Sequence, residues 1–257
     1  MLSCRLIPTL LISEGELYKT INFKSPKYVG DPLNTVRIFN EKEVDELIIL
    51  DISATKNNVE PDWGLIEHIS RECRMPLCYG GGLNSLERIE KLISLGVEKA
   101  AIGYAVFNNP EIIKDAIKIV GRQSIVGIID VKKTGIRRNY KTMVLNGSLK
   151  TNMNALEYAK YLEKIGVGEI LLQNIDLDGL MKGFDINLID LIYKNIDIPL
   201  TVLGGAGSLE DVRKLIQKFK LIGVAAGSLF IFKGKHRAVL VNYPDSNQKN
   251  KYLSIKK

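Results

Sequence analysis

The chain has 257 residues, of which 46% are hydrophobic and 25% charged, a balance that excludes a disordered protein. Its length suits a single α/β barrel of roughly 250 residues. It carries 36 Lys and Arg against 29 Asp and Glu, and the net charge of +7 is compatible with an anionic ligand or partner. No apolar run approaches the roughly 18 residues of a membrane-spanning helix.

Cysteine usage and the N-terminus predict a cytoplasmic protein. The three cysteines, Cys4, Cys73 and Cys78, are an odd number without CxxC spacing, so neither a disulfide scaffold nor a zinc site is expected. The first residues lack the pattern of a secretory signal. Only two histidines are present, His68 and His236, and we expect neither a bound metal nor a cofactor.

Eight short apolar runs alternate with helical patterns along the chain. Several are continuously apolar, as in parallel strands that are buried on both faces. The predicted strands are Arg5–Leu10, Leu47–Asp51, Leu77–Gly80, Ala100–Gly103, Ile125–Asp130, Ile170–Asn174, Leu200–Leu203 and Ile222–Ala226. Regular alternation of eight such units predicts a (β/α)8 TIM barrel, with a doubly wound sheet as the alternative.

Helix starts support this reading, since capping residues stand between the strands. They occur at Asp31-Pro32, Ser85, Asn109-Pro110 and Ser208.

The chain also repeats itself at half its length, which predicts a barrel made of two related halves. The segment Gly81-Gly82-Leu83-Asn84-Ser85-Leu86-Glu87 matches Gly204-Gly205-Ala206-Gly207-Ser208-Leu209-Glu210. Lys91-Leu92-Ile93 matches Lys214-Leu215-Ile216 at the same offset. No polar linker separates the two copies, which argues against two separate domains.

The barrel is predicted over residues 1–235, and residues 236–257 form a divergent C-terminal tail of the same domain. The part of the tail after Pro244 is polar and lysine-rich, and we expect it to be mobile. The long irregular stretch Val131–Asn152 directly follows a strand and is interpreted as a loop on the active face. Its basic part, Lys132–Lys141, suits a phosphorylated small molecule as well as nucleic acid, and no nucleic-acid-binding motif is present.

Glycine-rich turns follow three of the predicted strands and indicate phosphate binding. Such turns expose backbone N–H groups beside the start of a helix, although they also serve simply to make tight turns. Two copies at symmetric positions favour two phosphate sites on opposite sides of the barrel mouth. The candidate residues in these turns are Gly81, Gly82, Gly204, Gly205, Gly227 and Ser228.

Four carboxylates lie at or just after the carboxyl ends of strands, the face where barrel enzymes place catalytic groups. They are Asp51, Asp130, Asp176 and Asp178. Asp130 ends an apolar run, so its pKa could be raised toward that of a general acid or base. The alternative is that these carboxylates cap loops or helices.

Four further charged residues open strands and would lie together at the opposite end of the barrel: Arg5, Glu46, Lys99 and Glu169. Taken alone, they fit ordinary surface charge better than a functional ring.

These residues together resemble the cyclase subunit of imidazole glycerol phosphate synthase. The resemblance covers roughly residues 1–232. The matching segments include Arg5-Leu6-Ile7-Pro8, Gly30-Asp31-Pro32, Leu50-Asp51-Ile52, Gly80-Gly81-Gly82, Asp176-Leu177-Asp178-Gly179 and Gly204-Gly205-Ala206-Gly207. The resemblance implies a barrel that receives ammonia from a glutaminase docked at its bottom. It also implies that Arg5, Glu46, Lys99 and Glu169 gate the entrance.

The top face departs from the family pattern. Of the two catalytic aspartates in the family, the second corresponds to Asp130, whereas the first falls on Leu11, which cannot transfer a proton. The Asn-Thr pair near one phosphate is replaced by Gly103-Tyr104, and Tyr104 could still offer a backbone N–H. Lys19, Asp51 and Asp178 keep the family's residue types.

The ending Phe232–Pro244 lacks the family's last helix and looks like a branch associated with acetamidino modification of surface sugars. In that branch a glutaminase and a barrel supply ammonia to an ATP-dependent N-acetyl-sugar amidotransferase. We therefore expect such a role, with Asp130, Asp178 and Asp51 at the active site. The alternatives are a true histidine-pathway cyclase and a scaffold that only activates the glutaminase.

Overall fold

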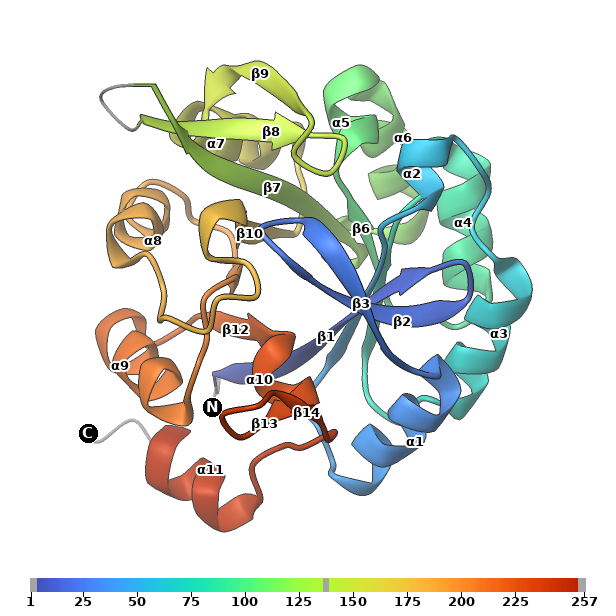
Figure 1. The fold of residues 1–257 in the computed structure, drawn as a ribbon. Coiled ribbons are helices and arrows are strands. Elements are labelled where there is room, and N and C mark those ends of the chain that lie inside the picture. The colour runs from blue at the N-terminus through green and yellow to red at the C-terminus, as the bar shows by residue number, and fades with distance from the viewer. Residues whose placement is uncertain (1–3, 136–138, 254–257) are drawn as a thin grey trace.

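The computed structural model describes residues 4–135 and 139–253. Residues 1–3 of the predicted barrel, 136–138 of the basic stretch and 254–257 of the predicted tail lie outside the described residues. Eight parallel strands close into a barrel in the order β1-β4-β5-β6-β7-β10-β11-β12, with β12 paired to β1 (Figure 1). The predicted (β/α)8 TIM barrel is confirmed.

The barrel strands agree closely with the predicted ones. Three of them, β4, β5 and β11, have the predicted bounds, and β1 and β7 extend further at their carboxyl ends. The strands are β1 (Arg5–Ser13), β4 (Leu47–Asp51), β5 (Leu77–Gly80), β6 (Lys99–Ile102), β7 (Ile125–Thr134), β10 (Glu169–Asn174), β11 (Leu200–Leu203) and β12 (Gly223–Ala226).

Helices surround the barrel and bury their apolar faces against the outer side of the strands (Figure 1). The side chains of Asp31, Ser85 and Ser208 cap helices, as predicted, and α6 begins one residue after Pro110. The helices are α1 (Pro32–Glu41), α2 (Ala54–Asn57), α3 (Trp63–Glu72), α4 (Leu86–Ser94), α5 (Tyr104–Asn108), α6 (Glu111–Val120), α7 (Ala155–Ile165), α8 (Ile186–Tyr193), α9 (Leu209–Phe219) and α10 (Ser228–Ile231).

The two halves of the sequence repeat have the same local structure. Gly81 and Gly204 both have positive φ, +120° and +99°. Ser85 and Ser208, each the N-cap of the next helix, share extended backbone angles and accept a hydrogen bond from the N–H three residues on. The repeated sequence therefore builds the same strand–turn–helix unit on two sides of the barrel.

Two antiparallel hairpins extend from the carboxyl ends of barrel strands. The first pairs β2 (Glu16–Ile21) with β3 (Lys24–Gly30), and the second pairs β8 (Asn139–Val144) with β9 (Leu149–Asn154). The prediction of an irregular loop over Val131–Asn152 is wrong, because β7 continues to Thr134 and pairs with β8. Its charged side chains lie on partly exposed strands, where a polar composition does not prevent pairing.

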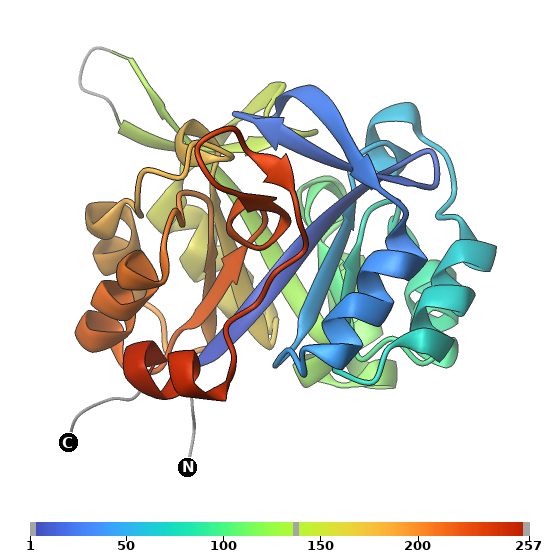
Figure 2. The ribbon, with the colours of Figure 1, turned by 60° about the horizontal axis from the view of Figure 1, so that its bottom comes forward.

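The C-terminal segment is also more ordered than expected. A short hairpin, β13 (Phe232–Lys233) with β14 (Ala238–Val239), precedes helix α11 (Ser246–Leu253). The part of the chain after Pro244, which the sequence predicts to be mobile, contains helix α11, and this helix packs beside α9. Figure 2 shows α11 at the end of the barrel where β1 begins, opposite the two large hairpins.

Candidate functional site

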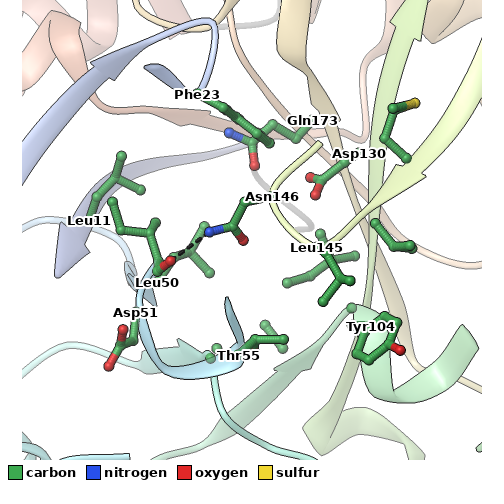
Figure 3. A pocket seen from close by; sticks show the side chains of 18 of the residues that line it. Leu11, Phe23, Leu50, Asp51, Thr55, Tyr104, Asp130, Leu145, Asn146 and Gln173 are labelled. Carbon is green, nitrogen blue, oxygen red and sulfur yellow. Dashed lines mark hydrogen bonds between the residues drawn. The ribbon is translucent and has the colours of Figure 1, made fainter. Parts of the chain in front are cut away.

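Three adjoining hollows occupy the carboxyl ends of the strands. The central pocket lies over the barrel axis and is lined by Leu11, Leu50, Tyr104, Asp130 and Gln173, among others (Figure 3). On one side it shares Gly81 and Tyr104 with a hollow that we call the β5–β6 pocket. On the other side it shares Leu11 and Gln173 with the β11–β12 pocket. One extended ligand can therefore reach both outer pockets through the centre.

The predicted phosphate-binding residues divide between the two outer pockets. Gly81, Gly82 and Tyr104 line the β5–β6 pocket. The β11–β12 pocket is lined by the others: Lys19, Gly204, Gly205, Gly227 and Ser228. The structure thus brings the predicted glycine turns together with Tyr104 on one side of the barrel and with Lys19 on the other.

Glycine is required where the backbone passes close to the neighbouring strand. A Cβ at Gly81 would lie 2.5 Å from the Asp51 carbonyl oxygen, and one at Gly204 would lie 2.7 Å from that of Asn174. Both residues also have positive φ. These close approaches leave a smooth backbone surface at each outer pocket, which suits a phosphate.

Asp130 is the carboxylate that faces the central pocket. Its side chain extends inward from β7, between apolar walls that include Ile128 and Met143. Burial and, to a smaller extent, the charge of Asp178 raise its pKa to about 7. A carboxyl group with this pKa can both hold and release a proton near neutral pH.

Leu11 lies across the central pocket from Asp130 (Figure 3). It is 7% exposed and packs with the apolar side chains that line the barrel interior. The pocket therefore has an apolar wall where the resemblance places a second catalytic carboxylate. Asp130 has no carboxylate at that position with which to act as an acid–base pair.

Asp178 and Lys19 border the β11–β12 pocket. The Asp178 carboxylate accepts hydrogen bonds from Thr20 Oγ1 at 2.7 Å and from the Phe23 N–H at 3.3 Å, and burial raises its pKa. The Lys19 ammonium donates to the Thr9 carbonyl oxygen, and burial lowers its pKa to about 8. Hairpin β2–β3 is thereby fixed over this pocket.

Asp51 is placed differently from the other two predicted catalytic carboxylates. Its Oδ1 accepts hydrogen bonds from the Ser53 N–H, the Ser53 hydroxyl and the Ala54 N–H, at 2.7–2.9 Å. Figure 3 shows the carboxylates of Asp51 and Asp130 on opposite sides of the central pocket. At the repeat-related position, Asn174 Oδ1 accepts from the Asp176 N–H at 3.0 Å. The geometry of Asp51 is therefore that of a turn-capping residue.

Asp176, the fourth carboxylate, accepts a hydrogen bond from the Lys133 N–H at 2.8 Å. Asp176 lies in the short helix η2 (Ile175–Leu177), and this hydrogen bond joins η2 to the carboxyl end of β7.

Asn146 also lines the central pocket, and the sequence analysis did not identify it. It lies in the turn between β8 and β9, and its Nδ2 donates to the Ile52 carbonyl oxygen after β4. The turn therefore crosses part of the barrel mouth (Figure 3). The dipeptide Asn146-Gly147 is a hairpin signal that could have revealed this turn.

The ring of charged residues forms at the opposite end of the barrel. Arg5 contacts Glu46 at 2.5 Å and Glu169 at 2.7 Å, and Lys99 contacts the same two carboxylates at 2.7 and 3.0 Å. Burial alone would raise the pKa of Glu169, but the charges of Arg5 and Lys99 outweigh it and lower that pKa. Cations and anions thus alternate around a closed ring, with both carboxylates buried.

The barrel interior between the ring and the central pocket is apolar. It is lined by a buried cluster distinct from the outer core, whose members include Ile7, Ile48, Cys78, Val126, Leu171 and Ala225. Cys78 belongs to this cluster, and burial raises the pKa of its thiol.

Neither a membrane helix nor a metal cluster is found among the described residues. No helix there is both long and apolar enough to cross a bilayer. No group of three or more His, Cys, Asp or Glu side chains is arranged to hold a metal ion in that part of the chain.

The chain is similar to a protein family and to individual proteins that are all named for histidine biosynthesis or for imidazole glycerol phosphate synthase. Residues 5–237 match the family described as "Histidine biosynthesis protein". A Vibrio vulnificus protein, provisionally named imidazole glycerol phosphate synthase subunit hisF3, is 51% identical over 255 residues, which cover 99% of this chain and 98% of the relative. A Leptospira interrogans protein, provisionally named subunit HisF of the same synthase, is 49% identical over 97% of this chain and 98% of its own length.

A third relative is less similar. Imidazole glycerol phosphate synthase subunit HisF of Leuconostoc mesenteroides is 36% identical over 231 residues, or 90% of this chain and 91% of the relative. The chain is thus similar to the two provisionally named proteins over almost its whole length, including most of the tail.

Proposed function

Because the chain belongs to the histidine biosynthesis protein family and is a HisF-like synthase subunit, we propose that it receives ammonia from a glutaminase and passes it through the barrel. The glutaminase would dock at the ring end. The ammonia would serve the amidination of an N-acetyl sugar in surface glycan synthesis, carried out with an ATP-dependent amidotransferase in the cytoplasm.

One combination of features supports this proposal above all others. The ring of Arg5, Glu46, Lys99 and Glu169 is complete at one end of the barrel, whereas Leu11 faces Asp130 at the other. Under this proposal the ring is the entrance for ammonia, and the molecule keeps that ring without the carboxylate pair that ring closure uses. A protein that only transfers ammonia needs the charged ring but does not need the carboxylate pair.

The apolar interior favours passage of a neutral molecule. Moving neutral ammonia from water into an apolar interior costs far less free energy than moving ammonium, because ammonium is an ion that would be left unpaired there. The buried cluster around Ile7, Cys78 and Val126 therefore suits ammonia and opposes ammonium. We propose that an anionic or phosphorylated small molecule binds at the mouth, and the glycine turns that line the two outer pockets support this.

A true cyclase of histidine biosynthesis is the second candidate. It is favoured by Asp130, whose pKa of about 7 suits acid–base chemistry. Under this alternative Asp130 works without a partner carboxylate. A third candidate, a scaffold that only activates the glutaminase, predicts that Asp130→Asn leaves the product of the pathway unchanged.

The first two candidates can be separated with the phosphoribulosyl-formimino substrate of the cyclase family and added ammonium. We expect no significant turnover by the natural protein, because general acid–base catalysis contributes roughly 10²–10⁴-fold. Leu11→Asp would raise the rate if the pocket is otherwise competent, and Leu11→Asn is the matched control without a proton to transfer. Rapid turnover by the natural protein, or rescue of a strain lacking its histidine-pathway cyclase, would contradict the proposal.

A further inference from the structure

The β13–β14 hairpin carries a cation to the rim of the β11–β12 pocket. Arg237 lies in the turn of this hairpin, with φ of +51°, and its N–H donates to the Gly234 carbonyl oxygen at 3.1 Å. Arg237 lies in the predicted divergent tail, for which the sequence suggests no role. The family match ends at this same residue.

The guanidinium of Arg237 is held by three neighbours. Its Nη2 donates to the Gly179 carbonyl oxygen at 3.0 Å and to Ser228 Oγ at 3.3 Å. Its Cζ lies 4.7 Å from the centroid of the Phe232 ring, a cation–π contact. Gly179 and Ser228 both line the β11–β12 pocket, so these contacts fix the positive charge at its edge.

The pocket beneath the guanidinium has the chemistry of an anion site. The ammonium of Lys19 is buried in it, with Nζ only 2.4 Å from where a Cβ at Gly227 would stand. The Thr9 hydroxyl, on a residue that is 2% exposed, has no hydrogen-bond partner within the described part of the chain and lines the same pocket. A buried ammonium and an unpartnered hydroxyl both call for a ligand with acceptor oxygens.

We propose that Arg237 is a binding and specificity-determining residue for a phosphate monoester dianion in the β11–β12 pocket. Its Nη2 is held by the protein, while its Nε and Nη1 donate to no other described residue, so that a guanidinium fixed in position keeps free N–H groups for a charge-assisted hydrogen bond to the phosphate. The C-terminal hairpin is therefore part of the ligand site. The inference deepens the proposed function, on which it rests for the anionic ligand at the mouth.

The test is binding of inorganic phosphate and of ribulose 1,5-bisphosphate, a general two-phosphate probe, followed by backbone NMR shifts of Gly205 and Ser228 and by calorimetry. We expect Arg237→Gln to weaken binding at the β11–β12 pocket at least tenfold. Arg237→Lys, which keeps the charge but lacks the planar guanidinium that Gly179 and Ser228 hold in position, should fall between Arg237→Gln and the natural protein. Lys235→Gln, in an exposed residue of the same turn, is the control and should change affinity less than twofold.

Two results would overturn the inference. One is Arg237→Gln binding phosphate as tightly as the natural protein, and the other is a natural protein whose Gly205 and Ser228 signals do not respond to either probe. Unaltered shifts elsewhere in the barrel would show that Arg237→Gln is folded. The proposed function has its own test, which is whether nitrogen from glutamine passes through the barrel. That test does not depend on Arg237, so the two proposals can fail independently.

Discussion

At the scale of single residues, chemistry at the mouth depends on the environment of Asp130. Burial raises its pKa to about 7, against 3.8 for an exposed aspartate. Between these values the folded protein holds a proton that the unfolded chain has lost. The contribution of Asp130 to stability therefore falls as pH rises through this window.

Asp130→Asn removes this dependence and is expected to flatten the pH profile. The free energy of unfolding of the natural protein, relative to the variant, should fall by up to about 1.4 kcal/mol per pH unit between pH 4 and 7. Urea unfolding at several pH values measures it, with Asp115→Asn on the exposed face of α6 as the control. Parallel profiles for the natural protein and Asp130→Asn would show that the Asp130 pKa is not raised.

Asp51 gives a second prediction at this scale, because its carboxylate accepts three hydrogen bonds from the turn that follows β4. An amide oxygen can accept the same bonds, as Asn174 shows at the repeat-related position. Asp51→Asn should retain the fold and product formation, while Asp51→Ala should lose about 1 kcal/mol of stability. A large loss of product formation in Asp51→Asn, with unchanged stability, would instead assign it a catalytic role.

At the scale of elements, the sequence best predicts the buried strands of the barrel and the glycine turns that occur in both halves of the chain. Eight apolar runs and the paired glycine turns define the barrel strands and both outer pockets. Helix α11 could not be found this way, because none of its side chains is buried and its apolar content is low. Its position depends on tertiary contacts, among them the pair Lys249–Asp45 at 2.7 Å.

The same reasoning explains the other misses. Hairpin β2–β3 has no long apolar run, and tertiary contacts hold it in place: its pairing with the end of β1, the burial of Leu17 and Val29, and hydrogen bonds such as that from Thr20 to Asp178. Arg237 has no motif that marks it, since the role that we propose for it depends on the turn that places its side chain at the pocket.

Tyr243 provides the test of whether the C-terminal segment belongs to the folded domain. Its hydroxyl donates to the Leu6 carbonyl oxygen at 2.8 Å and accepts from the Asp45 N–H at 3.3 Å. Tyr243→Phe leaves both buried backbone groups unpaired and should lower the free energy of unfolding by about 1–3 kcal/mol. Urea denaturation checks this against Tyr252→Phe on α11. Equal stability of the two variants would mean that the segment is not docked in solution.

At the scale of the whole molecule, the ring and the mouth are at opposite ends of one apolar interior. Lys99→Ala leaves Glu46 Oε1 and Glu169 Oε2 without the cation that joins them, and Arg5→Ala does the same on the other side of the ring. We expect both variants to hydrolyse more glutamine per product formed, because ammonia escapes at a damaged entrance. Lys164→Ala, on the exposed end of α7, is a control that leaves the ring intact.

Passage of ammonia through the barrel is the central claim, and isotope competition tests it most directly. The protein, its co-purifying glutaminase and the amidotransferase would be given glutamine labelled with 15N in the amide, together with excess unlabelled ammonium. The account predicts that the amidinated sugar carries mainly 15N, and that Arg5→Ala and Lys99→Ala shift it toward the unlabelled pool. A product that matches the bulk ammonium in the natural protein, with no change in either variant, would contradict it.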